Sequence, residues 1–325
     1  MKKTASTVIA SAAVIALIVL SFALSDFSLT EDMKKTLVIL LTVCGCSIVY
    51  CFTVGEITHN YSQMDKLWSV LPVVYTWIIA ARGGFGVRLT VFALIVTAWG
   101  VRLTVNFARK GAYRLKFWEG NEDYRWSIVR KSPVFRRPVV WTLFDLFFIS
   151  VYQNLLVLAI CLPALACTGS DAPFGAVDVI AAVLSVAFLL LETVSDEYQW
   201  KFHRKKKELL AEGKPLPELP RPYSLGFNTT GPWAYMRHPN YLGEQGMWAS
   251  LYLFVIGAGA ASHALFHPTA LGALLLILLF MGSSALGEKI SSGKYPAYKD
   301  YTAQVFKYLP LRRFDPDKKK GNKGS

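Results

Sequence analysis

The chain has 325 residues, of which 53% are hydrophobic and only 18% are charged, and its mean hydropathy is +0.36. An ordinary soluble domain carries about 25% charged residues, so this composition excludes a typical soluble globular protein and indicates an integral membrane protein. The net charge of +13 would also suit nucleic acid, but the basic residues lie in short connections between apolar segments, without a recognisable nucleic-acid-binding module. We therefore expect membrane lipids, and no nucleic acid, as partners of the basic residues.

Eight apolar segments follow one another along the chain: residues 8–24, 37–54, 69–81, 89–105, 139–158, 176–191, 247–261 and 269–286. A bilayer core about 30 Å thick is spanned by about 20 helical residues. The predicted fold is an all-α integral membrane protein, a bundle of seven or eight transmembrane helices with a cofactor cleft that faces the cytosol. We expect N-terminal transmembrane helices in residues 1–60, one membrane domain in residues 61–312 and a basic disordered tail in residues 313–325.

The distribution of basic residues predicts the orientation in the membrane. The first apolar segment follows Lys2 and Lys3 and looks like a secretory signal, but the many later spans favour a first helix that is retained. Lys and Arg concentrate in residues 109–137, 201–237 and 289–320, whereas residues 168–178 and 257–268 contain neither. Since cytosolic loops carry the excess of Lys and Arg, eight spans place both termini in the cytosol. Arg82 and Arg88 fall on the opposite side, against this rule.

The signatures of several soluble enzyme classes are missing from the chain. It contains no Gly-x-Ser-x-Gly, His-Glu-x-x-His, P-loop or Rossmann glycine motif after a strand, so any nucleotide must be bound in another way. The five cysteines lie in or beside apolar segments, and no pair has the spacing of a zinc site or of a redox Cys-x-x-Cys motif. We expect them to be small packing residues, and we expect no metal centre.

The apolar helix of residues 176–191 is predicted to continue outward to Leu210. Glu192, Asp196 and Gln199 are spaced by four and three residues, so they share one helix face at the membrane boundary. One interpretation is a solvated helix end. The other is a cofactor site in which these groups bind ribose or nicotinamide while nearby basic side chains, Lys201, His203 and Arg204, meet phosphate.

A dense polar and aromatic sequence, Gly231-Pro-Trp-Ala-Tyr-Met-Arg-His-Pro-Asn-Tyr-Leu-Gly-Glu244, runs into an apolar helix that begins near Met247. We call residues 231–244 the cassette. Pro232 suits the start of a helical turn, and Arg237 and His238 precede Pro239, where the chain must leave helical geometry. An interfacial aromatic belt explains the tryptophan and tyrosines. Asn240 and Glu244, one helical turn apart at the head of a membrane span, favour function, because polar groups there tend to mark a substrate or cofactor path.

These motifs together resemble the steroid 5-alpha-reductase superfamily, and most closely its branch of largely uncharacterised membrane proteins with a steroid 5-alpha-reductase C-terminal type domain. The resemblance covers roughly residues 60 to 312. It is carried by Glu192 with Asp196 and Phe202, by the cassette, by Glu288, and by Tyr295-x-x-Tyr-x-x-Tyr. Upstream motifs of the same kind are Asp65-Lys-Leu-Trp-Ser, Trp99-Gly-Val-Arg-Leu and Glu122-Asp-Tyr-Arg.

The resemblance implies an NADPH-dependent reductase of a carbon–carbon double bond conjugated to a carbonyl, acting on a sterol, steroid-like or other lipid substrate from the bilayer. It implies residence in the endoplasmic reticulum if the source is eukaryotic. Hydride delivered to the β carbon creates an enolate, so donors must stabilise charge on the carbonyl oxygen; most of the remaining task is positioning the cofactor. The oligomeric state stays open.

The matching motifs imply roles for particular residues. Asp196, Asn240 and Glu244, with His238 of the same cassette, belong to the cofactor site, and the phosphate candidates are Arg109, Arg125, Arg204 and Arg237. For the carbonyl, the family uses an acid or amide on an early helix with a tyrosine nearby. The corresponding region here offers Asp65 and Asn106 without an obvious tyrosine, and Tyr124 and Tyr241 are the alternatives.

Two other functions stay open. Isoprenylcysteine and phospholipid methyltransferases share the fold core, carry Arg-His-Pro-x-Tyr-x-Gly, and bind S-adenosylmethionine there. Glu244 directly after Gly243, the Asp196 helix and the Glu122–Arg125 loop favour the reductase, and methyltransferases typically show paired Glu where this chain has Glu288-Lys289. The third possibility is a lipid-binding scaffold that has lost catalysis.

Overall fold

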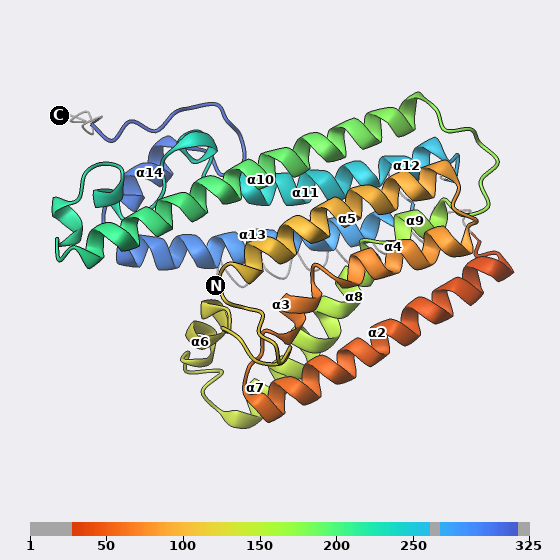
Figure 1. Ribbon diagram of the computed structural model, residues 1–325, viewed down its shortest axis with the longest axis horizontal. Coiled ribbons are helices and arrows are strands. Elements are labelled where there is room, and N and C mark those ends of the chain that lie inside the picture. The colour runs from red at the N-terminus through yellow and green to blue at the C-terminus, as the bar shows by residue number, and fades with distance from the viewer. Residues whose placement is uncertain (1–27, 261–266, 318–325) are drawn as a thin grey trace, which may run out of the picture. The chain divides into compact units, whose positions relative to one another are not determined.

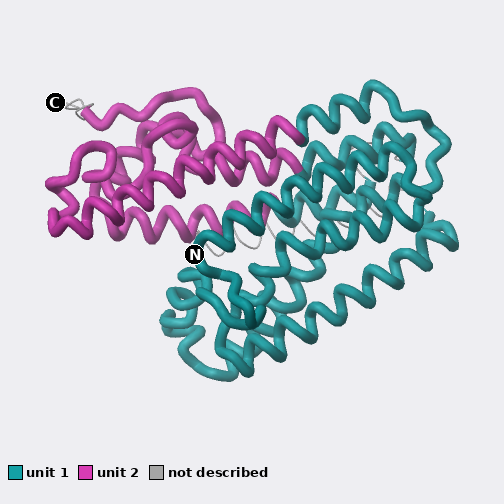
Figure 2. Tube along the Cα trace, in the orientation of Figure 1, with its two compact units in different colours: residues 1–185, 248–276 teal, residues 186–247, 277–325 magenta. Residues whose placement is uncertain are grey.

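The computed structural model describes residues 28–260 and 267–317, which form helices and connecting loops without a β-strand. The predicted all-helical class is confirmed. The described chain divides into two compact units (Figure 2), which are treated separately below. Unit 1 contains residues 28–185, 248–260 and 267–276, and unit 2 contains residues 186–247 and 277–317.

Unit 1 is built mainly from helices of the first half of the chain (Figure 1). They are α2 (Glu31–Thr58), α3 (Gln63–Leu67), α4 (Leu71–Arg82), α5 (Val87–Ala108), α6 (Tyr124–Arg130), α7 (Pro138–Phe144), the π-helix η1 (Asp145–Tyr152), α8 (Gln153–Ala159), α9 (Leu162–Ala166) and α12 (Leu253–Gly257). The predicted helix of residues 8–24 lies outside the described residues.

The long helix α2 begins where its sequence provides an N-terminal cap. The Thr30 side chain accepts a hydrogen bond from the Met33 amide at 3.2 Å, and Glu31 and Asp32 occupy the first turn, where the helix dipole favours negative charge. Helix α2 packs against α4, η1 and α8, and α4 packs against α5. Deep in this unit, the Trp99 and Trp248 rings meet edge to face with centroids 5.1 Å apart, a favourable geometry for two aromatic rings.

Arg88, which contradicts the simple charge rule for orientation, is an internal residue of unit 1. Its guanidinium donates to both carboxylate oxygens of Asp178, at 2.7 and 2.9 Å, and to the carbonyls of Ala172, Pro173 and Gly257. Arg88 is 7% exposed and Asp178 is fully buried. Because the charge is neutralised and hydrogen-bonded inside the protein, Arg88 does not behave like the solvated loop residues on which the charge rule depends.

Within residues 28–260 and 267–317, five helical segments are long and apolar enough to cross a membrane: Glu31–Thr58, Val87–Ala108, Pro138–Ala166, Ala176–Ala211 and Ala270–Lys294. These agree with five of the predicted spans and are consistent with a multi-pass membrane protein. Helix α4, with 12 residues, is shorter, and the predicted span of residues 247–261 is divided between α11 (Pro239–Leu251) and α12. The count of seven or eight spans and the orientation stay predictions.

Unit 2 contains the outer half of the chain's longest helix, α10 (Ala176–Ala211), together with most of α11, the end of α13 (Ala270–Lys294) and α14 (Tyr298–Gln304). The predicted outward extension of the 176–191 helix is therefore confirmed. The proline-rich connection that follows α10 contains only short 3-10 turns, at Leu216–Glu218, Tyr223–Leu225 and Gly231–Ala234, since proline restricts the residue before it to extended geometry. This connection leads the chain into the cassette.

Candidate functional site

The cassette divides into three local structures in unit 2, much as its prolines predict. Residues Gly231–Ala234 form a 3-10 turn with Pro232 near its start, residues 235–238 are irregular, and Pro239 begins helix α11. A proline at the first helical position costs no hydrogen bond, because the amide there has no partner within the helix. Arg237 and His238 therefore lie in the irregular link directly before the helix.

Helices α10 and α11 approach closely along a ladder of three contacts. A Cβ atom added to Gly246 would collide with the Phe188 ring, and one added to Gly243 would lie 2.6 Å from the Glu192 Cβ. Small residues at such a spacing let two helix backbones approach. The third contact lies one helical turn before Gly243, where Asn240 meets Asp196.

The polar contact at the end of this ladder joins two predicted cofactor residues. The Asn240 Nδ2 donates to the Asp196 Oδ1 at 3.1 Å. The Asn240 Oδ1 is buried and has no hydrogen-bond partner among the described residues, and the same holds for the Gln199 Oε1 and the Asn228 Nδ2. A buried polar atom without a partner costs free energy, and these three atoms all belong to unit 2.

Glu244 lies on α11 one turn after Asn240 and is only 3% exposed, and Glu192 on α10 is 4% exposed. Buried carboxyl groups are costly at a membrane boundary unless they are bound by other groups. The low exposure of Glu244 and Glu192 shows that both side chains lie inside unit 2. The interpretation of residues 192–199 as only a solvated helix end is wrong for Glu192.

Arg237 and His238 converge on Glu288 near the end of α13. The Arg237 Nε donates to the Glu288 Oε1 at 2.8 Å, and the His238 Nε2 lies 3.0 Å from the same oxygen. Arg237 also donates through Nη1 to the carbonyls of Val305, at 2.6 Å, and Thr302, at 3.2 Å. A guanidinium engaged this way has fewer N–H groups left for phosphate. Glu288 belongs to the matching motif but was not among the predicted site residues. Its position as an acid at the end of an apolar span is the sequence feature that could have identified it as a site residue.

The C-terminal segment holds the cassette in place through backbone pairing. The amides of Arg237 and His238 donate to the carbonyls of Phe306 and Lys307, both at 3.1 Å, and the Phe314 amide donates to the Ala234 carbonyl at 2.8 Å. This segment therefore fixes the irregular link that carries Arg237 and His238.

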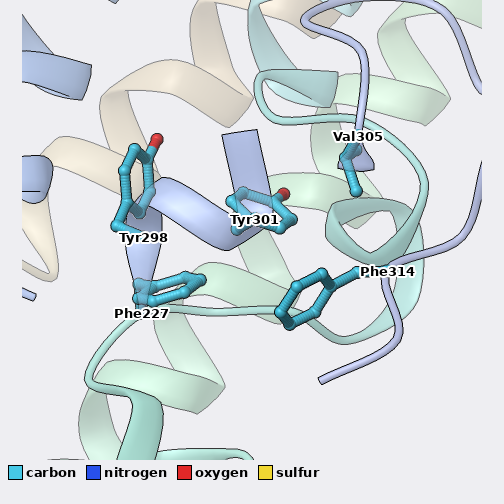
Figure 3. Packing of buried hydrophobic residues seen from close by; sticks show 5 residues of the cluster. All are labelled: Phe227, Tyr298, Tyr301, Val305 and Phe314. Atoms are coloured by element: carbon cyan, nitrogen blue, oxygen red, sulfur yellow. The ribbon is translucent and has the colours of Figure 1, made fainter. Parts of the chain in front are cut away.

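An aromatic cluster anchors the same region (Figure 3). Phe227, Tyr298, Tyr301, Val305 and Phe314 are all buried against one another. The Tyr301 hydroxyl lies 2.6 Å from the Trp233 carbonyl and 3.0 Å from that of Met236, and donates to this pair. Burial raises the pKa of Tyr301, so its hydroxyl keeps the proton with which it holds the cassette backbone.

The two other predicted residues of unit 2 have different environments. The Tyr241 ring stacks on the His238 ring, with centroids 5.2 Å apart, and meets Phe280 edge to face at 4.6 Å. Arg204 lies further along α10 with 66% of its side chain exposed, 3.7 Å from Glu208. Tyr241 is therefore a packed member of the Arg237–His238 region, whereas Arg204 is a solvated cation.

The remaining predicted residues belong to unit 1, where both predicted arginines form local pairs. The Arg109 Nε donates to the Asn106 Oδ1 at 3.0 Å, and Arg125 binds both carboxylate oxygens of Asp123, at 2.8 and 3.1 Å. Burial by itself would raise the pKa of Asp123, but the charge and hydrogen bonds of Arg125 lower it overall. In these pairs Arg109 and Arg125 already have acceptors.

Asp65 and Tyr124, the other two predicted residues of unit 1, differ in their surroundings. The Asp65 Oδ2 accepts a hydrogen bond from the Trp126 Nε1 at 2.7 Å. Burial raises the pKa of Asp65, although the charge of Arg125 opposes this, so Asp65 keeps a proton more readily than an exposed aspartate. Tyr124 begins α6 and is 60% exposed.

Two acids in unit 1, the buried Asp145 and the partly buried Glu56, were missed by the sequence reasoning. Asp145, at the start of the π-helix η1, is 1% exposed, and neither of its carboxylate oxygens has a hydrogen-bond partner among the described residues. It lies against Glu56 of α2, whose Oε2 accepts from the Thr142 hydroxyl at 3.2 Å. The signal for both was a single acid within an apolar run, and π-helical turns often mark functional positions.

The fold and these contacts define a helical protein whose long apolar helices are consistent with a multi-pass membrane protein, with a polar helix junction in one of its two units. A family described as "Protein of unknown function (DUF1295)" matches residues 51–305, and the chain belongs to this family. All of the predicted site residues fall within the matched range. A relative from Schizosaccharomyces pombe, "Uncharacterized protein C594.04c", is 36% identical over 265 residues, which cover 78% of this chain and 73% of the relative. No solved structure matches the chain.

Proposed function

We propose that the protein is an NADPH-dependent reductase that acts in the membrane on a carbon–carbon double bond conjugated to a carbonyl, in a sterol-like or other lipid substrate. The observation that carries the proposal is the Asp196–Asn240 pair, at 3.1 Å, with the buried Glu244 one turn away. The resemblance to the steroid 5-alpha-reductase superfamily supports it, because these positions match that family's cofactor residues. We further propose cytosolic termini and, in a eukaryote, the endoplasmic reticulum.

The residues of unit 2 fit the polar half of a dinucleotide. Asp196 and the unused Asn240 Oδ1 accept hydrogen bonds, as ribose hydroxyls and a carboxamide NH₂ require, and the unused Asn228 Nδ2 donates one. The exposed Lys201 and Arg204 on the outer part of α10 suit phosphate better than Arg237, which Glu288 and two carbonyls already engage.

The proposed reaction requires a hydride, a proton and stabilisation of an enolate. Bound NADPH supplies the hydride. The chain must hold the substrate carbonyl against a donor, because negative charge develops on that oxygen. Four side chains are proposed for this role: Asp65, Asn106, Tyr124 and Tyr241. We place Tyr241 first, because it lies on α11 in the same unit as the Asp196–Asn240 pair.

One part of the site does not separate the reductase from the methyltransferase. The Arg237–His238–Glu288 contacts belong to the part of the motif that both enzyme classes share, so they are equally compatible with S-adenosylmethionine. The polar contacts of Asp196 with Asn240 favour the reductase, because the Asp196 helix is one of the features that resemble only that class.

The deciding experiment compares cofactors on the purified full-length protein in detergent. A ligand at 100 times its dissociation constant stabilises the folded state by about 2.7 kcal/mol. We expect millimolar NADPH to raise the unfolding midpoint of the wild type and of a Lys205→Ala control, and to have little effect on Asp196→Ala and Asn240→Ala. Stabilisation by S-adenosylmethionine but not by NADPH would establish the methyltransferase, and a response to neither would favour the scaffold.

A further inference from the structure

Unit 1 contains a basic cleft that the proposed reaction does not use. It lies along α6 and the loop from α6 to α7, and has a volume of about 320 Å³. Its lining consists of Glu122, Ser127, Arg130, Lys131 and Arg136. We call this feature the α6 cleft.

The charge of the α6 cleft is positive, and its one acid is already bound. The Glu122 Oε1 accepts from the Tyr61 amide at 3.0 Å and from the Arg130 Nη2 at 3.4 Å. Lys131 and Arg136 are exposed, and no ion pair joins either of them to an acid within the described part of the chain. Three cations therefore face one acid that is held by the backbone, so the cleft is suited to an anion.

Two aromatic rings hold Arg130 in addition to its contact with Glu122. Its guanidinium lies over the Tyr61 ring at 4.5 Å and over the Trp141 ring at 4.8 Å. Its Nε is buried and has no hydrogen-bond partner among the described residues. A guanidinium stacked on aromatic faces keeps its N–H edge in a fixed plane, which matches the oxygens of a phosphate group.

The location of the α6 cleft indicates where the anion comes from. The loop leads directly to Pro138, the first residue of the candidate membrane span Pro138–Ala166. Apolar side chains beside the cations are exposed, with Val134 at 63% and Val139 at 71%. Basic residues next to a membrane helix, mixed with exposed apolar ones, are expected at the level of lipid headgroups.

We propose that the α6 cleft binds the phosphate of an anionic glycerophospholipid headgroup, with Arg130, Lys131 and Arg136 as its ligands. Residues 125–137 contain five basic residues and no acidic one, so the local field also favours lipids of net negative charge over zwitterionic ones. This proposal does not depend on the identity of the cofactor or on the reductase reaction.

The test measures binding of short-chain phosphatidylserine and phosphatidylcholine to the detergent-purified full chain by native mass spectrometry. The cleft variant is Arg130→Gln/Lys131→Gln/Arg136→Gln. The control, Lys205→Gln/Lys207→Gln/Lys214→Gln, removes the same charge from exposed positions of unit 2. We expect the wild type and the control to prefer phosphatidylserine, and the cleft variant to bind it at least about tenfold more weakly.

Three outcomes would overturn the proposal. The first is an unchanged preference in the cleft variant. The second is an equal loss in both triple variants, which would show unspecific attraction. The third is competition of NADPH or inorganic phosphate with the lipid, which would make the cleft a site for soluble phosphates. If the triple variant fails to fold, Lys131→Gln and Arg136→Gln are measured singly, because neither side chain takes part in the aromatic stacking, and each is expected to weaken phosphatidylserine binding.

Discussion

Exchanging the two partners of the Asp196–Asn240 contact separates its structural role from its role in binding. Asn240→Asp places a second carboxylate 3.1 Å from Asp196. Two unit charges about 4 Å apart repel by ~1 kcal/mol in water and ~4 kcal/mol near a protein surface, and the lost hydrogen bond adds ~1 kcal/mol. We therefore expect Asn240→Asp to reduce the free energy of unfolding by about 2–5 kcal/mol.

The reversed pair, Asp196→Asn with Asn240→Asp, restores one carboxylate and one amide at the same positions. We expect it to regain most of the lost stability but not the stabilisation by NADPH, because the carboxylate now lies on the wrong helix. Four of the five cysteines are buried, so a thiol-reactive dye reports unfolding during a temperature ramp.

Two results would refute this reasoning. If Asn240→Asp is as stable as the wild type, the two side chains are not in contact. If the reversed pair recovers both stability and the NADPH response, the contact only holds α10 against α11, and the cofactor does not distinguish the two positions.

Three further predictions concern stability. Glu288→Ala leaves Arg237 without its carboxylate at a site where the two side chains are 14% and 19% exposed, so we expect a loss of about 2–4 kcal/mol. Glu31→Ala, which breaks an exposed ion pair, is the control and should cost no more than about 0.5 kcal/mol; equal losses would contradict the role of Glu288. Asp145→Asn should change stability by less than about 1 kcal/mol, because it removes a buried carboxylate that lacks a hydrogen-bond partner, and a larger loss in chemical denaturation would show that the carboxylate has a partner. Burial lowers the pKa of Lys66 from 10.5 to about 8. The unfolded chain therefore binds more protons between pH 8 and 10.5, and the wild type should gain stability relative to Lys66→Met as the pH rises through this range; a stability difference that does not change with pH would show that Lys66 stays charged.

Much of the fold was predictable because long apolar runs and prolines act locally. The outward extension of α10 to Ala211 follows from helix periodicity. Helix α11 was expected to begin near Met247 but begins at Pro239, because a proline is tolerated at the first helical position. The structure brings two of the predicted cofactor residues into contact, and their role stays a prediction. Asp196 and Asn240 meet as expected from their motifs, but Arg237, expected to bind phosphate, is engaged by Glu288.

The sequence by itself determined the membrane class, the helices and the cassette at the head of α11, since composition, apolar length and local backbone restrictions decide these. Only the tertiary structure decided which polar groups are neutralised and which stay available. Arg88 with Asp178 and Arg237 with Glu288 are 90 and 51 residues apart along the chain. Such groups come into contact only when the helices pack. In the weakly polar interior a buried charge is tolerated only if it is paired with an opposite charge.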